Sequence, residues 1–252
     1  MNTQGLYVFC AIPRREPIEF GTERMAGQDR SVYTVNHKDV GMVVCEVDEE
    51  ILPLRRHFLA HQRVVGRVFE KFTTIPFRFG TTVGSQDEVK QLAHNLYDQL
   101  NGLFQRLDNK IELGLRVVGR QDWLDLQIDR FPELSILANQ LKVQGEQDAL
   151  LYSRVRLGEL AQELFESLEK QIQAEVHLPL SRLADESRLN DIGPDRLLLN
   201  AAYLIDRENE REFDNVVNQI YTKWEAKAEF GYSGPWPAYN FVSLSKGVKG
   251  ES

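Results

Sequence analysis

The sequence has few of the features that mark metal-binding, secreted or membrane proteins. Its 252 residues include two cysteines, Cys10 and Cys45, and both lie in apolar runs without a metal-binding spacing. We expect two small buried side chains, because a disulfide would require neighbouring strands and is disfavoured in a reducing compartment. No apolar run approaches the ~18–20 residues of a membrane helix, and the N-terminus lacks the basic start of a signal peptide. These absences favour a cytoplasmic protein with no membrane partner.

Basic residues are also too few for a dedicated nucleic-acid-binding protein. Lysine and arginine total 30, against 38 aspartates and glutamates, which gives a net charge of −8 at pH 7. Binding to nucleic acid depends on clustered basic residues that neutralise phosphates. We therefore expect no nucleic-acid partner. Hydrophobic residues make up 42% of the chain, which is enough to fill the core of one large domain or two ordinary ones.

Patterns that can signal catalysis or metal binding are each incomplete. His57 and His61 have the i, i+4 spacing of a zinc-binding helix, but Phe58 stands where a catalytic glutamate would be. Gly80 and Gly84 precede a helix without the lysine of a phosphate-binding loop. No nucleophile–base pair accompanies them. We expect no catalytic residues, no metal site and no cofactor.

The first 109 residues have the pattern of a small α+β domain. Residues 6–12 form a short apolar run, which is typical of a buried strand. Residues 29–35 and 40–47 are β-branched runs around a short polar turn, and they predict a β-hairpin. The intervening segment, residues 14–27, mixes proline, glycine and charge and is most simply a loop.

Two amphipathic helices follow the hairpin. Acidic residues from Asp48 open the first, and apolar residues that include Leu54 and Phe58 recur at helical spacing to Phe72. Arginines line its other face, which we interpret as solvated, although such a stripe can also meet an acidic partner or lipid. Ser85 begins a capping box at the start of the second helix, which continues to about residue 107.

From Lys110 the predicted elements follow the order strand, helix, strand, strand, helix, strand. This is the order of a ferredoxin-like βαββαβ fold, and it predicts a second domain over residues 110–252 with a polar C-terminal tail. The first strand, residues 110–118, alternates with Glu112 on its exposed side. A helical pattern then runs from about residue 134 and ends at Pro179.

The last three elements of this domain are less uniform in their signals. Residues 183–189 are a weak, polar strand candidate. Residues 196–205 are almost entirely apolar, as in a strand that is buried on both faces. Residues 206–229 have the spacing of a third amphipathic helix.

The stretch 234–242 concentrates large apolar side chains near the C-terminus. Trp236, Tyr239 and Phe241 could each bury on the order of 150–250 Å². Two prolines confine an extended chain here to the edge of a sheet, because proline donates no ladder hydrogen bond. We predict that residues 232–242 form the last strand. This strand either closes the core of the second domain or presents an edge that binds a partner.

Four runs together resemble the gas vesicle protein family GvpF/GvpL. They occur in the family's order, span nearly the whole chain, and are Ile75-Pro-Phe-Arg-Phe-Gly-Thr81, Lys110-Ile-Glu-Leu-Gly-Leu-Arg-Val117, Asn200-Ala-Ala-Tyr-Leu-Ile205 and Gly234-Pro-Trp-Pro-Ala-Tyr-Asn-Phe241. Each run alone is moderately specific, and the combination is strong. Ala238 departs from the pattern, since the family often has another proline there.

The resemblance implies a minor, non-enzymatic protein of gas vesicles in the cytoplasm. Its expected role is in vesicle assembly, as a chaperone-like or structural accessory that binds the hydrophobic main shell protein and contacts other minor gas vesicle proteins. Open sheet edges could add a strand from such a partner.

We expect partner contacts at Arg78, Trp236, Tyr239 and Phe241, although the pattern around Arg78 by itself favours a structural ion pair or a hydrogen bond to the nearby loops. The alternative is a ferredoxin-like module that binds or converts a small molecule, with a pocket around Arg78 and His61.

Overall fold

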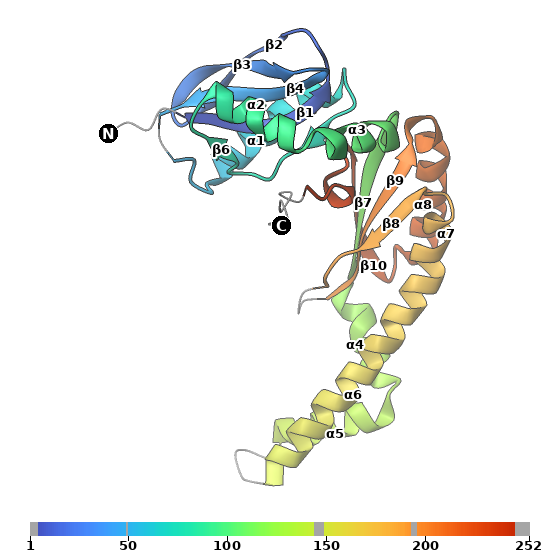
Figure 1. Ribbon diagram of the computed structural model, residues 1–252. Helices are drawn as coiled ribbons and strands as arrows, with labels where there is room; N and C mark the ends of the chain where they lie inside the picture. The colour runs from blue at the N-terminus through green and yellow to red at the C-terminus, as the bar shows by residue number, and fades with distance from the viewer. Residues whose placement is uncertain (1–4, 49, 144–148, 193–195, 245–252) are drawn as a thin grey trace, which may run out of the picture. The chain divides into compact units, whose positions relative to one another are not determined.

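The computed structural model describes residues 5–48, 50–143, 149–192 and 196–244 (Figure 1). Within these residues the chain forms two compact units. The first contains the residues up to Glu112 together with those from Pro235 onward, and the second is Leu113–Gly234. We predicted a division at residues 109 and 110, with the whole C-terminal stretch in the second domain. The segment that follows Gly234 instead folds with the first unit.

The first unit is built on an antiparallel sheet of six strands. Their order is β2-β3-β4-β1-β5, and β6 also pairs with β1. The strands are β1 (Gly5–Pro13), β2 (Glu19–Met25), β3 (Gln28–His37), β4 (Val40–Val47), β5 (Ile75–Pro76) and β6 (Thr82–Val83). The predicted hairpin is therefore present as β3 and β4, which pair in antiparallel register from Tyr33 and Val44 to His37 and Val40.

Strand β2 was not predicted, because its residues read as a loop. It occupies one end of the sheet order, where only one of its sides pairs with a neighbour. An edge strand tolerates glycine and charge, and a register shift between Glu19 and Thr22 accommodates Gly21 with φ +79°. Ala26 and Gly27, both with positive φ, then make the tight turn into β3.

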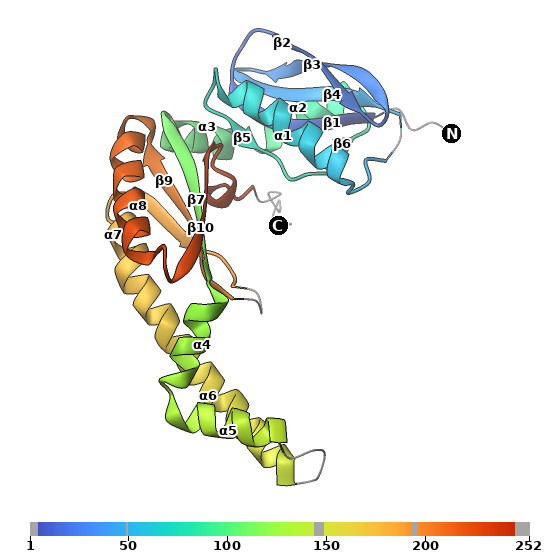
Figure 2. The ribbon, with the colours of Figure 1, turned by 180° about the vertical axis from the view of Figure 1, so that it is seen from behind.

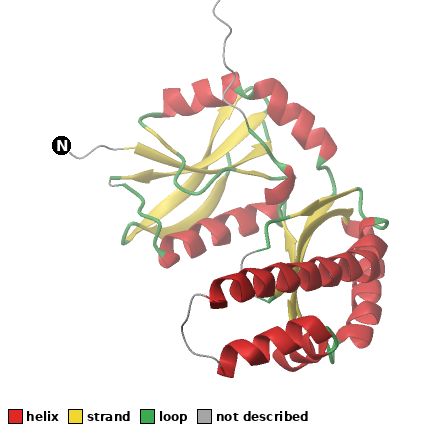
Figure 3. Cartoon of the chain, turned by 90° about the horizontal axis from the view of Figure 1, so that it is seen from below, coloured by secondary structure: helices red, strands yellow, loops and turns green. Residues whose placement is uncertain are grey.

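Helices cover both faces of this sheet (Figure 3). They are α1 (Arg55–Phe69), α2 (Gln86–Asn95) and α3 (Tyr97–Arg106). Helix α1 packs on the face that includes Phe9 and Val43, in one hydrophobic core. Helix α2 lies on the opposite face, where the rings of His94 and His37 are 5.3 Å apart. Because both faces are covered, β4 is buried at every position except Glu46.

The buried side of α1 differs from the prediction. We expected Leu54 and Phe58 to face the core, but they are 37% and 43% exposed. The buried side includes Val65 and Val68 of the predicted apolar stripe. Its other members include His57, His61 and Val64, which were not predicted there. The helix also begins later than predicted, at Arg55, because its N-cap residue Leu54 has extended backbone geometry with ψ 144°.

The second predicted helix is divided into α2 and α3. Its predicted cap is confirmed, since the Ser85 Oγ accepts a hydrogen bond of 3.2 Å from the backbone N–H of Glu88. Leu96 separates the two helices with φ −100° and ψ 3°, outside the α-helical range. The side chain of Leu96 is buried, so the break keeps the helical layer in contact with its core.

The second unit contains an antiparallel sheet of four strands in the order β10-β7-β9-β8. Its strands are β7 (Lys110–Gly119), β8 (Glu186–Leu189), β9 (Leu197–Asp206) and β10 (Ala228–Trp236). Its helical segments are α4 (Gln121–Asp129), α5 (Pro132–Val143), α6 (Ala149–Ile172), a π-helical turn (Gln173–His177), α7 (Leu178–Ser181), a 3₁₀ turn (Arg207–Asn209) and α8 (Glu210–Trp224).

Helix α8 lies along this sheet, and α5 and α6 pack together and extend beyond it (Figure 2). The Tyr203 side chain of β9 joins the layers, because its ring lies 5.2 Å from Phe213 of α8 and its hydroxyl is 3.0 Å from the Nδ1 of His177. We predicted that Pro179 ends the helical region. It lies instead in the first turn of α7, where its missing N–H costs little.

The last strand begins and ends earlier than predicted. Helix α8 ends at Trp224, and β10 runs from Ala228 to Trp236, where we had expected residues 232–242. Strand β10 is an edge strand, as its prolines predicted. Beyond it, Pro237 cannot donate to a ladder, and Tyr239–Phe241 form a 3₁₀ turn that belongs to the first unit. Only residues 234–236 of the stretch 234–242 therefore belong to the last strand of the second sheet.

Candidate interaction site

The loop that carries Arg78 is fixed to the edge of the first sheet. Strand β5 pairs with β1, and the backbone N–H of Phe77 donates to the carbonyl of Phe9 at 2.9 Å. The hydroxyl of Thr81 donates to the Arg78 carbonyl at 2.8 Å. The Arg78 side chain is exposed, and no hydrogen bond or ion pair joins it to another described residue. The loop thus presents a guanidinium group on a backbone that is held by strand pairing and hydrogen bonds.

A buried hydrogen-bonded chain holds the same loop from within. The N–H of Gly80 donates to the Tyr7 hydroxyl at 3.2 Å, and this hydroxyl lies 2.9 Å from the Nδ1 of His61 on α1. Burial lowers the pKa of His61 to about 4 and raises the pKa of Tyr7 to about 12. The histidine is therefore neutral at pH 7, and its Nδ1 can accept the tyrosine proton.

Phenylalanine side chains extend this arrangement to the surface. Phe79 stacks on Phe58 of α1, with ring centroids 3.9 Å apart and an angle of 21° between the planes. Phe58 is nevertheless 43% exposed. The pair leaves an aromatic face open to solvent beside the loop.

The C-terminal segment, residues 235–244, is held by hydrogen bonds to the buried carboxylate of Glu112. One oxygen of this carboxylate accepts the backbone N–H of Asn240 at 2.7 Å, and the other accepts its side-chain amide at 2.6 Å. The guanidinium of Arg106 also donates to the carbonyl of Phe241. We predicted that Glu112 lies on an exposed face. Its burial is possible because both oxygens are hydrogen-bonded.

These contacts separate the three predicted aromatic residues into two classes. Phe241 is buried, with 2% of its surface exposed. Trp236 and Tyr239 are 43% and 39% exposed. Phe241 therefore anchors the segment in the first unit, while the other two rings face outward.

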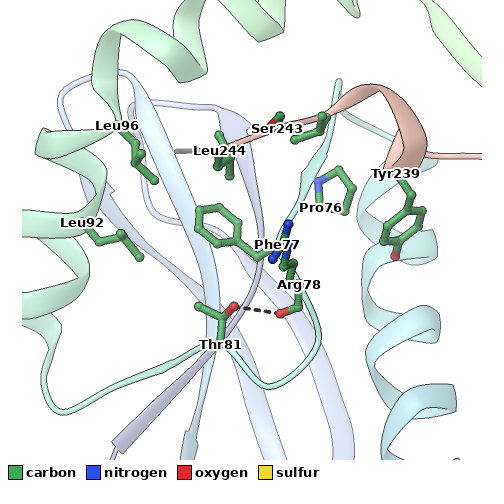
Figure 4. Close-up of a pocket in the computed structure, with 10 residues that line it drawn as sticks. Pro76, Phe77, Arg78, Thr81, Leu92, Leu96, Tyr239, Ser243 and Leu244 are labelled. Carbon is green, nitrogen blue, oxygen red and sulfur yellow. Dashed lines mark hydrogen bonds between the residues drawn. The ribbon is translucent and has the colours of Figure 1, made fainter. Parts of the chain in front are cut away.

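A cavity of about 480 Å³ lies between β5, α2 and the C-terminal segment (Figure 4). Its volume is within the range of about 300–1,000 Å³ that is usual for ligand pockets. The lining residues are Pro76, Phe77, Arg78, Thr81, Leu92, Leu96, Tyr239, Val242, Ser243 and Leu244. Arg78 and Tyr239, which were both singled out from the sequence, thus meet at one site.

A second cavity, of about 180 Å³, is also lined by Tyr239. It is lined by Gln62 and Gly66 of α1, by Glu112, and by Trp236, Pro237 and Tyr239. Gly66 contributes to this hollow because it has no side chain, and a Cβ placed there would meet nothing within 4 Å. Tyr239 therefore contributes to the lining of both cavities.

Sequence reasoning identified only part of this lining. Leu92 and Leu96 looked like ordinary core positions of an amphipathic helix, and Val242 looked like the end of a strand. Their i, i+4 spacing shows that the two leucines share a helix face, but not that the face borders a cavity. His61, which we had considered as a pocket residue together with Arg78, lines neither of these two cavities.

The described residues offer little for catalysis or metal binding. They contain no group of three or more histidine, cysteine, aspartate or glutamate side chains placed to hold a metal ion. Cys10 and Cys45 are buried free thiols, and burial raises the pKa of Cys45 to about 12. Across the same part of the chain, the helices are too short or too polar to cross a membrane.

Comparison with known proteins decides the family. The model of the family described as "Gas vesicle synthesis protein GvpL/GvpF" matches residues 5–243, which is nearly the whole chain. The chain belongs to this family. The resemblance seen in the four sequence runs is thereby confirmed. The match includes β5, Arg78 and all of the other residues that line the larger cavity except Leu244.

Individual GvpL/GvpF relatives agree in length and fold. Gas vesicle protein F1 of Halobacterium salinarum is 26% identical over 252 residues, which cover 98% of this chain and 97% of the relative. The crystal structure of GvpF from Anabaena sp. PCC7120 superposes with a TM-score of 0.79 at 25% identity, and 96% of this chain and 99% of that chain are covered. The structure of GvpF from Microcystis aeruginosa has a TM-score of 0.75 at 22% identity, with coverage of 95% and 99%. The α+β architecture with two sheets is thus that of GvpF.

Proposed function

We propose that this GvpL/GvpF protein is a non-enzymatic accessory factor that binds the hydrophobic main shell protein during gas vesicle assembly. The supporting observation is the pair of exposed rings, Trp236 and Tyr239, on a segment that Glu112 and Phe241 fix in place. Exposed aromatic side chains in a well-ordered surface are typical of protein-binding sites. The family's description supplies the process, gas vesicle synthesis.

Exposed aromatic side chains on an anchored segment suit a chaperone-like or structural accessory role. Binding costs conformational entropy when loops become ordered, and a segment that is already anchored avoids part of this cost. A small hydrophobic subunit would cover the exposed rings and would itself be shielded before it polymerises. The protein would then act at the gas vesicle, in the cytoplasm.

The second unit supplies further surfaces in this proposal. Its strand order β10-β7-β9-β8 is the one expected for a ferredoxin-like sheet, and we propose that topology for it. Such a sheet has β8 and β10 at its edges, where other minor gas vesicle proteins could add a strand. The acidic balance of the chain gives nucleic acid no part in this function.

Co-expression with the main shell protein tests the proposal. The tagged chain should retain the shell protein on an affinity resin, and a strain without the gene should form few or abnormal vesicles. Failure to retain the shell protein, together with normal vesicles in the deletion strain, would contradict the proposed function.

A small-molecule site is the second candidate, and the cavity beside Arg78 is the observation that favours it. A ligand for this cavity would be apolar with one anionic group. The ten described residues of the lining favour binding as the candidate function, because Arg78 is the one charged side chain among them. A metabolite that co-purifies with the chain and is absent from an Arg78→Gln variant would support this function.

A further inference from the structure

The cavity beside β5 combines an apolar lining with a single charged group. Of the ten described residues that line it, only Arg78 carries a charge. Its guanidinium makes no hydrogen bond or ion pair with the rest of the described chain. Arginines elsewhere in the same unit are used differently, since Arg63 and Arg67 both bind the buried Glu23. Arg78 thus carries a positive charge with no structural partner among the described residues, and it lies at the border of this largely apolar cavity, which we call the groove.

The chemistry of this group defines what it can recognise. Arginine stays protonated at any physiological pH and presents a planar set of donors that fits a carboxylate in bidentate geometry. Such a bond is stronger where neighbouring apolar groups exclude water. Phe77, Leu92 and Leu96 provide those apolar groups here.

The walls of the groove are already in position. The loop around Arg78 is held by strand pairing and by the bond between Gly80 and Tyr7. Helix α2 forms a second wall with Leu92 and Leu96. The C-terminal segment, which is hydrogen-bonded to Glu112, forms a third wall. A ligand would therefore enter a formed site without ordering a loop.

We propose that this groove receives an apolar segment of the partner protein that places one carboxylate against Arg78. The inference rests on the proposed function, in which the partner is the main shell protein. A protein segment fits better than a small ligand, because Tyr239 lines this groove and also the neighbouring cavity with Trp236. A chain that fills the groove can continue over the exposed rings, which gives one continuous contact surface.

Variants that reverse or remove the charge of Arg78 test the proposed contact between its guanidinium and a carboxylate of the partner. Arg78→Glu and Arg78→Gln should reduce capture of co-expressed shell protein roughly tenfold or more, as expected when a partly buried ion pair loses one member. Arg24→Glu is the matched control, since Arg24 is exposed on β2, at the opposite end of the sheet order from β5. Equal thermal unfolding of the Arg78→Glu and Arg24→Glu variants would show that both are folded.

A photo-crosslinking amino acid in place of Leu92 identifies the occupant. The expected product joins the shell protein, within an apolar stretch that contains an aspartate or glutamate. Changing that acidic residue to lysine should restore capture by the Arg78→Glu variant. Crosslinking to a second copy of this chain instead, or a lack of rescue, would overturn the inference.

The outcomes separate the two proposals. If the wild-type chain does not capture the shell protein, the proposed function fails. If the wild type captures it and the Arg78→Glu variant does so as well as Arg24→Glu, the function stands and the groove is not the site of this contact.

Discussion

Protonation of His61 should destabilise the first unit as the pH falls below neutrality. In the folded chain, burial lowers the pKa of His61 to about 4, against 6.5 when it is exposed after unfolding. Between pH 4 and pH 6.5, His61 is mostly protonated in the unfolded state and mostly neutral in the folded state. The contribution of His61 to stability is therefore complete above pH 6.5 and is lost as the pH falls toward 4.

The size of this effect follows from the difference between the two pKa values. At ~1.36 kcal/mol per pH unit, it amounts to about 3 kcal/mol between pH 6.5 and pH 4. This is a large part of the ~5–15 kcal/mol that stabilises a typical domain. Loss of the neutral histidine would also remove the acceptor for the Tyr7 hydroxyl, which holds Gly80 in the Arg78 loop.

Urea unfolding from pH 4 to 8 would measure the loss, with His61→Asn as the reference. Asparagine does not titrate in this range, so the stability difference between wild type and variant isolates the histidine. This difference should shrink by about 3 kcal/mol as the pH falls from 6.5 to 4. In parallel, NMR titration of the imidazole should give a pKa near 4 in the folded chain.

Tyr7→Phe separates burial from hydrogen bonding. The substitution removes the hydroxyl and leaves the ring beside His61, so most of the pKa depression should remain, because burial is its cause. A His61 pKa near 6.5 in the folded wild type, with a stability difference that does not change with pH, would refute the reasoning.

Other variants test the packing of the first unit by urea unfolding. Glu112→Gln should cost about 1.5–3 kcal/mol, because the amide offers one oxygen where the carboxylate accepts both bonds from Asn240; an unchanged midpoint would argue against this anchor. Phe241→Ala should cost about 3–5 kcal/mol, whereas Trp236→Ala should cost about 1 kcal/mol, since the tryptophan is 43% exposed. The opposite ranking would show that the two side chains have been assigned the wrong roles. Ser85→Ala should cost about 1 kcal/mol through loss of the α2 cap, and restoration by Ser85→Asp is the control.

The sequence predicted correctly those elements whose structure depends on residues close together in the chain. The β3–β4 hairpin follows from β-branched runs around a short turn, and the cap at Ser85 follows from its spacing to Glu88. The alternation from Lys110 likewise predicted β7. In each case the residues that decide the structure lie within a few positions of one another.

Contacts between distant residues explain the errors. Glu112 looked exposed by alternation alone, and its partner Asn240 lies 128 residues further along the chain. On α1, His57 and His61 are buried where Phe58 was expected, and the buried Tyr7 hydroxyl supplies a partner for His61. Neither pairing has a local signature.

The candidate site was recognised in part for the same reason. Arg78, Trp236 and Tyr239 stood out by their motifs, but the groove forms only when α2 and the C-terminal segment meet at β5. In an extended strand Tyr239 and Phe241 would share one face. The 3₁₀ turn instead leaves Tyr239 exposed and buries Phe241. Tyr239 can therefore contact a partner, whereas Phe241 anchors the segment.

The most direct test is the amount of main shell protein that co-purifies with the wild-type chain and with two tyrosine variants. Tyr239 and Tyr221 are 39% and 38% exposed, but Tyr221 lies on α8 of the second unit. If the exposed rings of the C-terminal segment bind the shell protein, Tyr239→Ala should retain much less of it than Tyr221→Ala or the wild type. Equal retention by all three chains would contradict binding at this surface.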